Sequence, residues 1–363
     1  MSKSELFENL DKLRESEGKV ALATLVNTRG TTPRKEGAQM LVGEGGRILG
    51  SVTIGGCVDA QVIEESAGVL EGNRPRLLEL DLGDEEAWEI GLTCGGTIEV
   101  FMEPVTLDRP DATLALYERA RAHADTGGRA AIVTRLDGEG NGAKRLVLDT
   151  GVAEGTLGSA DLDRRVTEEA RAALAAGKSK TLLLEGMRAF IEVLAPPSVL
   201  AIIGASHVAM PLVTLARTLG YRTVVVDGRP RFATRERFPD ADDLRIGIPS
   251  ELVRDIPMLA TTALVLVAHD YKYDVPVLKH ALASPVGYIG LLGSSRRGAA
   301  ILNILREDGV AAEALERVRV PIGLDLGAQS APEIALAILA EVLAVHRKAT
   351  GMPIVEKVRR GLK

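Results

Sequence analysis

Two cysteines are the only thiols among the 363 residues, and each lies next to a pair of glycines. Cys57 follows Gly55-Gly56, and Cys94 precedes Gly95-Gly96. Apolar residues at helical spacing after Cys57 predict a helix that begins there, where free N–H groups and the helix dipole favour a thiolate. Glycines also leave room beside a sulfur for a ligand or a sulfur-transfer partner. A lone cysteine is more simply a small buried hydrophobe, but two such pairs predict a working site with both thiols as its reactive groups.

A turn in the second half of the chain resembles an incomplete dinucleotide-binding fingerprint. It follows a predicted strand at 199–203, and the fingerprint places glycine at 204 and 206 and glycine or alanine at 209. Gly204 and Ala209 match, whereas Ser206 puts a side chain where a pyrophosphate would approach the backbone. Asp227 follows 23 residues after Gly204, at about the spacing of an acid that binds a ribose hydroxyl. The pattern predicts a nucleotide-type fold and leaves the binding of NAD(P) itself open.

Further polar residues follow the predicted strands of this half, at the sheet edge where such folds bind ligands. These candidates are His207, His269, Asp270, Ser294, Arg296 and Arg297. Residues 293–297 resemble a Gly-Ser turn that opens a helix, and free N–H groups beside two guanidinium groups suit an anion. Taken singly, His207 is equally well explained as an exposed first-turn residue, and His269 as a residue bonded only to nearby backbone. Arg296 and Arg297, taken singly, are more simply explained as solvated. Their convergence on one edge favours a binding site.

The elements that must position the cysteines are mostly strands. Helices are predicted at 4–17, from 58 to 70, at 111–125 with Asp111 as the N-cap, and at 163–176. Strands are predicted at 20–27, 40–42, 47–52, 77–82, 98–102, 131–135, 145–148, 180–184 and 189–194. Many strands with interspersed helices predict a mixed α+β domain over residues 1–195.

Pro196-Pro197-Ser198 is the predicted linker, and the pattern changes after it. Over residues 199–363 strands alternate regularly with helices. The strands are expected at 199–203, 223–227, 244–247, 262–268 and 286–292, and the helices at 207–219, 274–283, 296–308 and 331–347. Regular alternation with short connections predicts a Rossmann-like, doubly wound parallel sheet, so the C-terminal domain is of the α/β class.

Composition excludes several classes of protein. The net charge is −6 and no basic stripe is present, so we expect no nucleic-acid partner. The polar start and the lack of a long apolar run predict neither a signal peptide nor a membrane span. Two cysteines cannot form a disulfide framework, which indicates a reduced, cytoplasmic setting. The five histidines and two cysteines show no metal-ligand spacing, so we expect no structural metal.

Eight motifs together resemble the xanthine dehydrogenase accessory-factor family (XdhC/CoxI-like). In the first half they are TTPR at 31–34, GSVTIGGCV at 50–58 and GLTCGG at 91–96. In the second half they are SHVA at 206–209, VVDGRP at 225–230, HDYKYD at 269–274, YIGLLGS at 288–294 and PIGLD at 321–325. The resemblance covers nearly the whole chain after residue 20. The chain departs from the family pattern at Ser206, where glycine is frequent, and at Thr53, which replaces a further glycine.

The resemblance implies a role in maturing molybdenum hydroxylases. Members bind the molybdopterin cofactor, assist the exchange of its oxo ligand for sulfido, and pass it to an apo-enzyme. The implied partners are a cysteine desulfurase and an enzyme of the xanthine or carbon monoxide dehydrogenase type, and the implied assembly is a homodimer. Cys57 and Cys94 would then contact the molybdenum end or a sulfur in transit. The helix starts after 206 and 295, with Arg296 and Arg297, would neutralise the pterin phosphate.

Two other functions stay open at this point. One is an NAD(P)-dependent oxidoreductase that uses the Rossmann half alone, with His207 or His269 as proton donor. The other is a nucleotide-sensing scaffold without chemistry. A complete xanthine dehydrogenase is excluded, because two cysteines cannot ligate even one four-thiolate cluster. The cofactor-handling interpretation requires both thiols to face the mouth of the Rossmann crevice.

Overall fold

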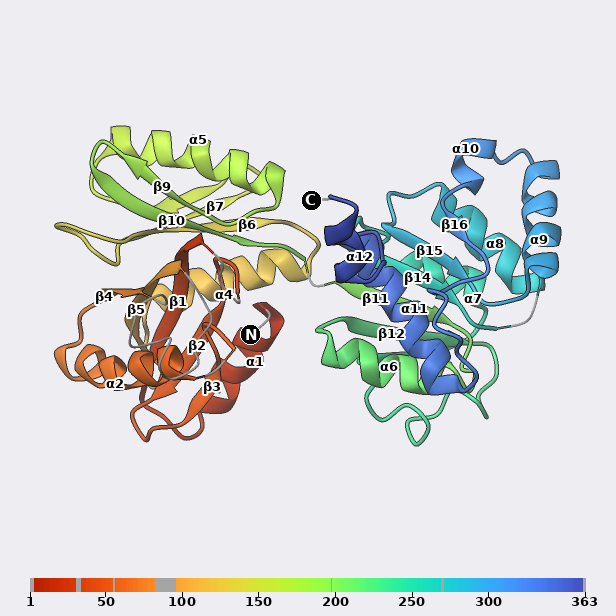
Figure 1. Ribbon diagram of the computed structural model, residues 1–363, viewed down its shortest axis with the longest axis horizontal. Coiled ribbons are helices and arrows are strands. Elements are labelled where there is room, and N and C mark those ends of the chain that lie inside the picture. The colour runs from red at the N-terminus through yellow and green to blue at the C-terminus, as the bar shows by residue number, and fades with distance from the viewer. Residues whose placement is uncertain are drawn as a thin grey trace. The chain divides into compact units, whose positions relative to one another are not determined.

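The computed structural model describes residues 3–30, 34–54, 56–81, 96–196, 198–268 and 271–361. The chain divides into two compact units, Met1–Pro196 and Pro197–Lys363 (Figure 1). The first unit carries antiparallel sheets and the second a parallel sheet with helices on both faces. This confirms the predicted class, a mixed N-terminal domain and a Rossmann-like C-terminal domain.

Two five-stranded antiparallel sheets build the first unit. Sheet A has the order β3-β2-β1-β5-β4, and sheet B has the order β8-β7-β6-β10-β9. The strands of sheet A are β1 (Lys19–Gly30), β2 (Gln39–Gly43), β3 (Ile48–Gly50), β4 (Arg76–Asp81) and β5 (Gly96–Thr106). Those of sheet B are β6 (Ala130–Arg135), β7 (Lys144–Leu148), β8 (Ala153–Gly155), β9 (Lys180–Leu184) and β10 (Met187–Leu194).

Alternating side chains of these strands feed separate cores, as the two-residue period of a strand requires. Ala21, Ala23 and Leu25 of β1 pack with α2 (Cys57–Gly72), whereas Val20 and Leu22 lie in a second core. That second core also receives α1 (Lys3–Leu13), α4 (Ala112–Asp125) and strands of sheet B. Sheet B is covered on its other face by α5 (Ala160–Ala176). The predicted N-cap of α4 is confirmed, since the Asp111 carboxylate accepts from the N–H of Leu114.

A buried ion pair joins the two sheets. Lys144 Nζ of β7 lies 2.8 Å from Glu103 Oε1 of β5, and the two side chains are only 3% and 5% exposed. Lys144 also donates to Thr134 Oγ1 over 2.7 Å. Burial raises the pKa of Glu103, and the nearby Lys144 ammonium offsets that rise only in part. Breaking such a pair leaves an uncompensated charge in the core, so each partner depends on the other.

A second buried carboxylate lies in the same core. Glu192 of β10 accepts from Tyr117 Oη over 2.6 Å and from Gln39 Nε2 over 3.0 Å. Burial, and after it the charge of Glu103, holds the pKa of the Tyr117 phenol well above 10. Tyr117 therefore stays a neutral donor to this carboxylate, and Gln39 of sheet A reaches Glu192 of sheet B across the core.

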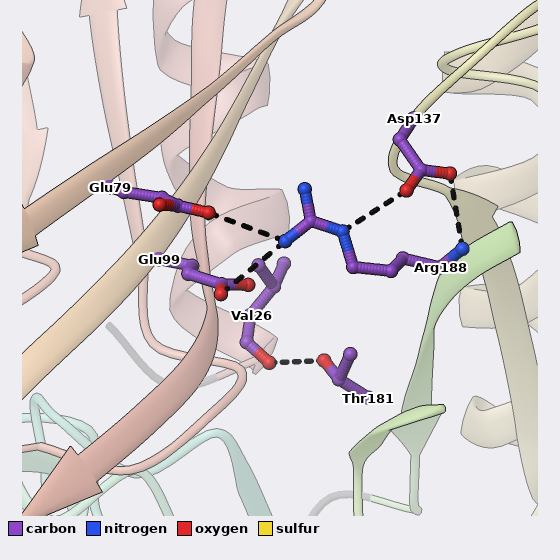
Figure 2. Close-up of polar contacts among 6 residues, drawn as sticks. All are labelled: Val26, Glu79, Glu99, Asp137, Thr181 and Arg188. Carbon is purple, nitrogen blue, oxygen red and sulfur yellow. Dashed lines mark hydrogen bonds and ion pairs between the residues drawn. The ribbon is translucent and has the colours of Figure 1, made fainter. Parts of the chain in front are cut away.

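An arginine clasp at the rim of the two sheets adds to this connection (Figure 2). Arg188 of β10 donates from its backbone N and from Nε to the Asp137 carboxylate, both over 3.0 Å. Its Nη1 reaches 3.4 Å to Glu79 of β4 and 3.4 Å to Glu99 of β5. The Thr181 hydroxyl of β9 also donates to the backbone oxygen of Val26 in β1. One guanidinium of sheet B thus binds two carboxylates of sheet A and one in the loop after β6.

We expect Arg188→Gln to lower the free energy of unfolding by about 1–2 kcal/mol, because three carboxylates lose a shared cation that is only partly screened by water. Urea titration followed by far-ultraviolet circular dichroism measures the change. Arg164→Gln is the matched control, because Arg164 makes only helix-surface pairs with Asp161 and Glu168. The control should unfold like the natural chain; equal shifts in both variants would show that Arg188 is no more than a surface charge.

The second unit is built on a six-stranded parallel sheet with the order β13-β12-β11-β14-β15-β16. Its strands are β11 (Val199–Ile203), β12 (Arg222–Asp227), β13 (Asp243–Ile246), β14 (Thr262–Leu266), β15 (Tyr288–Leu291) and β16 (Val318–Arg319). The strand order reverses between β11 and β14, which is the switch point where such sheets bind ligands.

Helices cover both faces of this sheet, as the near-continuous apolar strands require. One face packs against α6 (Ala209–Thr218) and α11 (Ala331–His346), and the other against α8 (Tyr271–Leu282) and α9 (Ser295–Glu307). The short helices are α7 (Pro249–Leu252), α10 (Ala312–Leu315) and α12 (Ile354–Arg359). Among the described residues of the whole chain, no helix is long and apolar enough to cross a bilayer.

Candidate functional site

Gly30 and Gly96 lie side by side at one end of sheet A. β1 and β5 run antiparallel, and Gly30, the last residue of β1, pairs with Gly96, the first residue of β5. Gly96 has φ +151°, and a Cβ there would lie 2.3 Å from the backbone oxygen of Arg29, so only glycine fits. The strand end that precedes TTPR therefore lies beside the strand start that closes GLTCGG.

Helix α2 directs Cys57 toward the same end. Near the C-terminus of α2, the backbone oxygen of Leu70 lies 3.5 Å from Nζ of Lys19, the first residue of β1. One turn earlier, Ser66 Oγ lies 4.0 Å from Met102 Sδ, and Met102 pairs with Ala23. The helix thus runs opposite to β1, and its first residue, Cys57, lies on the side of Gly30 and Gly96. The backbone confirms that a helix begins at Cys57.

A buried carboxylate organises the loop before that helix. Asp59 is 8% exposed and accepts from the Thr53 hydroxyl over 3.0 Å, from the Thr53 N–H over 3.3 Å and from the Ser51 hydroxyl. Arg34, the last residue of TTPR, donates from Nη1 to the Ser51 backbone oxygen over 3.0 Å. Gly56 has φ +92°, a conformation that favours glycine. Asp59 therefore fixes Ser51 and Thr53, in the loop before α2, relative to the first turn of the helix that begins at Cys57.

Asp59 was not among the predicted site residues, although an acid in the first turn of a helix is a recognisable signal. Of the predicted residues in this unit, Gly56 and Gly96 are described, and Cys57 is described in its backbone. Gly55, Cys94 and Gly95 lie outside the described residues. The assignment of both thiols as reactive groups stays a prediction, as does their orientation toward the Rossmann crevice.

A cavity of about 500 Å³ opens at the carboxyl ends of β11, β12 and β14 in the second unit. That volume lies in the range of cofactor sites. Four predicted residues line it together, namely Gly204, Ser206, His207 and Asp227. Gly204 has φ +109°, and a Cβ there would lie 2.6 Å from both N and Cβ of Ala268, so the tight first turn requires glycine. The incomplete fingerprint therefore marks a real cavity at the switch point of the sheet.

Neighbouring N–H groups take up almost all of the acceptor positions of the Asp227 carboxylate. Its Oδ1 accepts from the N–H and Nε of Arg229 over 2.8 and 2.9 Å, and its Oδ2 accepts from Arg229 Nη2 over 2.8 Å and from the Ala205 N–H over 2.6 Å. Burial alone would raise the pKa of Asp227, but the bonds from Arg229 and from the Ala205 N–H hold that pKa below its ordinary value. Asp227 is thus an ionised anchor for Arg229.

Two other residues of this cavity differ in their surroundings. The Ser206 hydroxyl oxygen is buried and has no hydrogen-bond partner within the described ranges, whereas His207 is exposed. Buried hydroxyls nearly always have a hydrogen-bond partner, so the Ser206 hydroxyl is an exception among the described residues. His269 and Asp270, predicted for the same edge, lie outside the described residues.

The turn at 293–297 does not line this cavity. Ser294 is the N-cap of α9 and accepts from the N–H of Arg297 over 3.3 Å, as the predicted Gly-Ser turn requires. The Arg297 guanidinium forms an ion pair with Asp274, which is fully buried in α8, whereas Arg296 is exposed. Of the predicted anion-binding pair, one arginine already neutralises a carboxylate inside the fold. Over the described part of the chain, no group of three or more His, Cys, Asp or Glu side chains is placed to hold a metal ion.

Comparison with known proteins adds an independent line of information. The family model described as "XdhC and CoxI family" matches residues 13–81 and 123–185, and the one described as "XdhC Rossmann domain" matches residues 200–342. A Bacillus subtilis (strain 168) protein, named as a probable subunit of xanthine dehydrogenase, is 27% identical over 348 residues, which cover 93% of this chain and 97% of the relative.

Two further relatives match over most of their length. The Escherichia coli (strain K12) "Molybdenum cofactor insertion chaperone PaoD" is 28% identical over 338 residues, which cover 93% of this chain and 86% of that protein. A crystal structure from Bacillus halodurans, described as that of a xanthine dehydrogenase, shares 28% identity with a TM-score of 0.78 over 96% of each chain. The matches include both units, and they extend through the cysteine motif at 50–58 and the cavity of the second unit.

Proposed function

This chain belongs to the XdhC and CoxI family, and from this membership we propose that it is an accessory protein that binds the molybdenum cofactor as cargo. It assists the insertion of the cofactor into a molybdenum hydroxylase of the xanthine or carbon monoxide dehydrogenase type. The name of the E. coli relative, a molybdenum cofactor insertion chaperone that aligns over 93% of this chain, supports the proposal. The name of the B. subtilis relative supports a xanthine dehydrogenase as the enzyme that is served.

The observation that carries this proposal is that the start of α2 at Cys57 and the start of β5 at Gly96 lie toward the same end of sheet A. Cys57 begins a helix of 16 residues, and Gly96 begins the strand that follows Cys94 by two residues. A helix N-terminus favours a thiolate, which is the form of cysteine that acts as a nucleophile and as a metal ligand. Cys57 and Cys94 are therefore the proposed contacts for the molybdenum end of the cargo or for a sulfur in transit, and the flanking glycines leave it room.

The proposal extends to the sulfuration of the cargo before insertion. A cysteine desulfurase is the proposed source of sulfur, and the apo-form of the molybdenum hydroxylase is the proposed acceptor of the finished cofactor. The pterin phosphate would be neutralised by the helix starts after 206 and 295, with Arg296 and Arg297. The remaining proposed cofactor-binding residues of this unit are Gly204, Ser206, His207, Asp227, His269, Asp270 and Ser294. The chain is proposed to act in the cytoplasm as a homodimer.

Transfer of cofactor to an apo-enzyme tests this function. The chain is purified from a host that makes the molybdenum cofactor, and again from a host that cannot. Each preparation is mixed with the apo-form of a molybdenum hydroxylase, and the appearance of substrate-oxidising activity is followed. We expect activation only by the first preparation. Equal activation by both, or oxidation of xanthine by the chain alone with NAD(P), would overturn the accessory role in favour of the oxidoreductase alternative.

A further inference from the structure

The cavity of the second unit differs from a plain ribose site at the end of β12. In a sheet of this type, the acid that ends the second strand binds the ribose hydroxyls. A carboxylate offers about four acceptor positions, and those of Asp227 already receive four N–H donors from Arg229 and Ala205. A ribose diol would have to displace one of these bonds. Asp227 is therefore built to position Arg229.

Two guanidinium groups line the cavity together with Asp227. The Arg229 side chain is 54% exposed, and its Cζ lies 4.3 Å from the centre of the Phe232 ring. Cζ of Arg237 lies 5.4 Å from the same ring, and Arg237 Nη1 donates to the backbone oxygens of Phe232 and Ala205 over 2.7 and 3.1 Å. Planar guanidinium groups held by stacking and by backbone bonds are suited to phosphate, which they bind through paired hydrogen bonds.

The charge of the lining agrees with an anionic ligand. Among the described residues, the charged side chains that line the cavity are Asp227, Arg229 and Arg237, so two cations face one anion and the excess is one positive charge. At the first turn of the same cavity, the Ser206 hydroxyl oxygen is buried without a partner in the described part of the chain. An acceptor oxygen of a ligand in this cavity would give that hydroxyl a hydrogen-bond partner. The positive charge excess follows β12 and the unpartnered hydroxyl follows β11, so the two observations are separate. Both indicate a phosphorylated ligand.

We propose that this cavity binds a ribonucleotide whose ribose carries a phosphomonoester, with Arg229 and Arg237 as the phosphate ligands and Asp227 as the residue that positions Arg229. In folds of this type, an arginine near the end of the second strand accommodates a 2′-phosphate, whereas a bare acid selects the diol. The proposal rests on the second unit alone, and it does not depend on the proposed handling of the molybdenum cofactor.

Isothermal titration of the full chain with NADP⁺, NAD⁺ and inorganic phosphate tests the proposal. We expect NADP⁺ to bind at least about tenfold more tightly than NAD⁺, as charge-assisted contacts to one phosphate predict. Inorganic phosphate should bind more weakly than NADP⁺, because it lacks the nucleoside that fills the cavity. Equal affinity for NADP⁺ and NAD⁺, no binding of either, or phosphate binding as tight as that of NADP⁺ would overturn the proposal.

Variants separate the phosphate contact from the fold. Arg229→Gln and, independently, Arg237→Gln should each weaken NADP⁺ about tenfold and leave NAD⁺ within about twofold. Arg222→Gln is the matched control, because Arg222 is exposed at the opposite end of the same strand, and it should leave both affinities unchanged. Asp227→Asn should lower the ratio of NADP⁺ to NAD⁺ affinity, whereas a merely structural role would leave that ratio constant.

The experiment also distinguishes this proposal from the proposed function. Cys57→Ser and Cys94→Ser should abolish transfer of the molybdenum cofactor and leave NADP⁺ binding unchanged. Arg237→Gln should alter NADP⁺ binding by the chain purified from a host that cannot make that cargo. If the arginine variants weaken the affinities for NADP⁺ and NAD⁺ by the same factor, these arginines do not recognise a ribose phosphate. This inference then fails, while the accessory role stands.

Discussion

Cys94→Ser is expected to reduce the molybdenum cofactor retained by the purified chain by about tenfold or more, the scale on which loss of a metal-contacting or supporting group acts. Serine keeps the size of the side chain, but its hydroxyl is not ionised near neutral pH and cannot act as a thiolate nucleophile or sulfur carrier. Molybdenum is measured by mass spectrometry and pterin by fluorescence, both after gel filtration. Cys57→Ser should show the same loss, because a thiolate at the first position of α2 is lost.

The stability of these variants decides between two roles for the thiols. If Cys94 is a working group, Cys94→Ser should unfold at the temperature of the natural chain. If the cysteine is instead a small buried hydrophobe, serine should lower the unfolding temperature and leave cofactor retention unchanged. Thermal unfolding by circular dichroism, measured on the same samples, therefore complements the cofactor assay. Unchanged retention would remove Cys94 from the site.

Lys144→Met is expected to have the largest effect on stability, a loss of about 3–5 kcal/mol in the free energy of unfolding. The reason is that Glu103 would stay buried without its cation, in a core where Lys144 is its ion-pair partner at 2.8 Å. Urea unfolding of the full chain, followed by circular dichroism, measures the loss in the transition that belongs to the first unit.

A double substitution shows whether the pair itself is needed. Glu103→Leu together with Lys144→Met replaces both charges by apolar groups of similar size, and this should recover most of the stability lost in Lys144→Met. Glu103→Leu alone should again be destabilising, because the Lys144 ammonium is then left buried. If the two single losses simply add in the double variant, the residues do not act as a pair, and the joining of the two sheets has another basis.

Much of the second unit could be predicted from the sequence, because buried parallel strands appear as short apolar runs. The runs predicted at 199–203 and 262–268 became β11 and β14, the second of which ends at Leu266, and Gly204 marked the tight turn at the ligand edge. The spacing of 23 residues also placed Asp227 in the cavity. What spacing could not show was the partner of Asp227. A carboxylate with an arginine two residues later is a local signal, but only the fold shows that the arginine folds back onto it.

Contacts between distant segments were beyond sequence reasoning. Glu103 and Lys144 lie in different strands, 41 residues apart, and no local sequence pattern predicts that they form a pair. The same holds for Arg297, whose partner Asp274 lies on the preceding helix. The helix predicted at 4–17 ends at Leu13, because its last residues turn before β1. Polar pairing across a core depends on tertiary packing, which periodicity does not record.

The proposed carriage of the molybdenum cofactor is tested by the composition of the full chain after purification from a host that makes this cofactor. Molybdenum, pterin and nicotinamide nucleotide are measured per chain on the same gel-filtered sample. We expect pterin and molybdenum in amounts close to the chain itself. Nicotinamide nucleotide in that amount with no pterin and no molybdenum would contradict the accessory role.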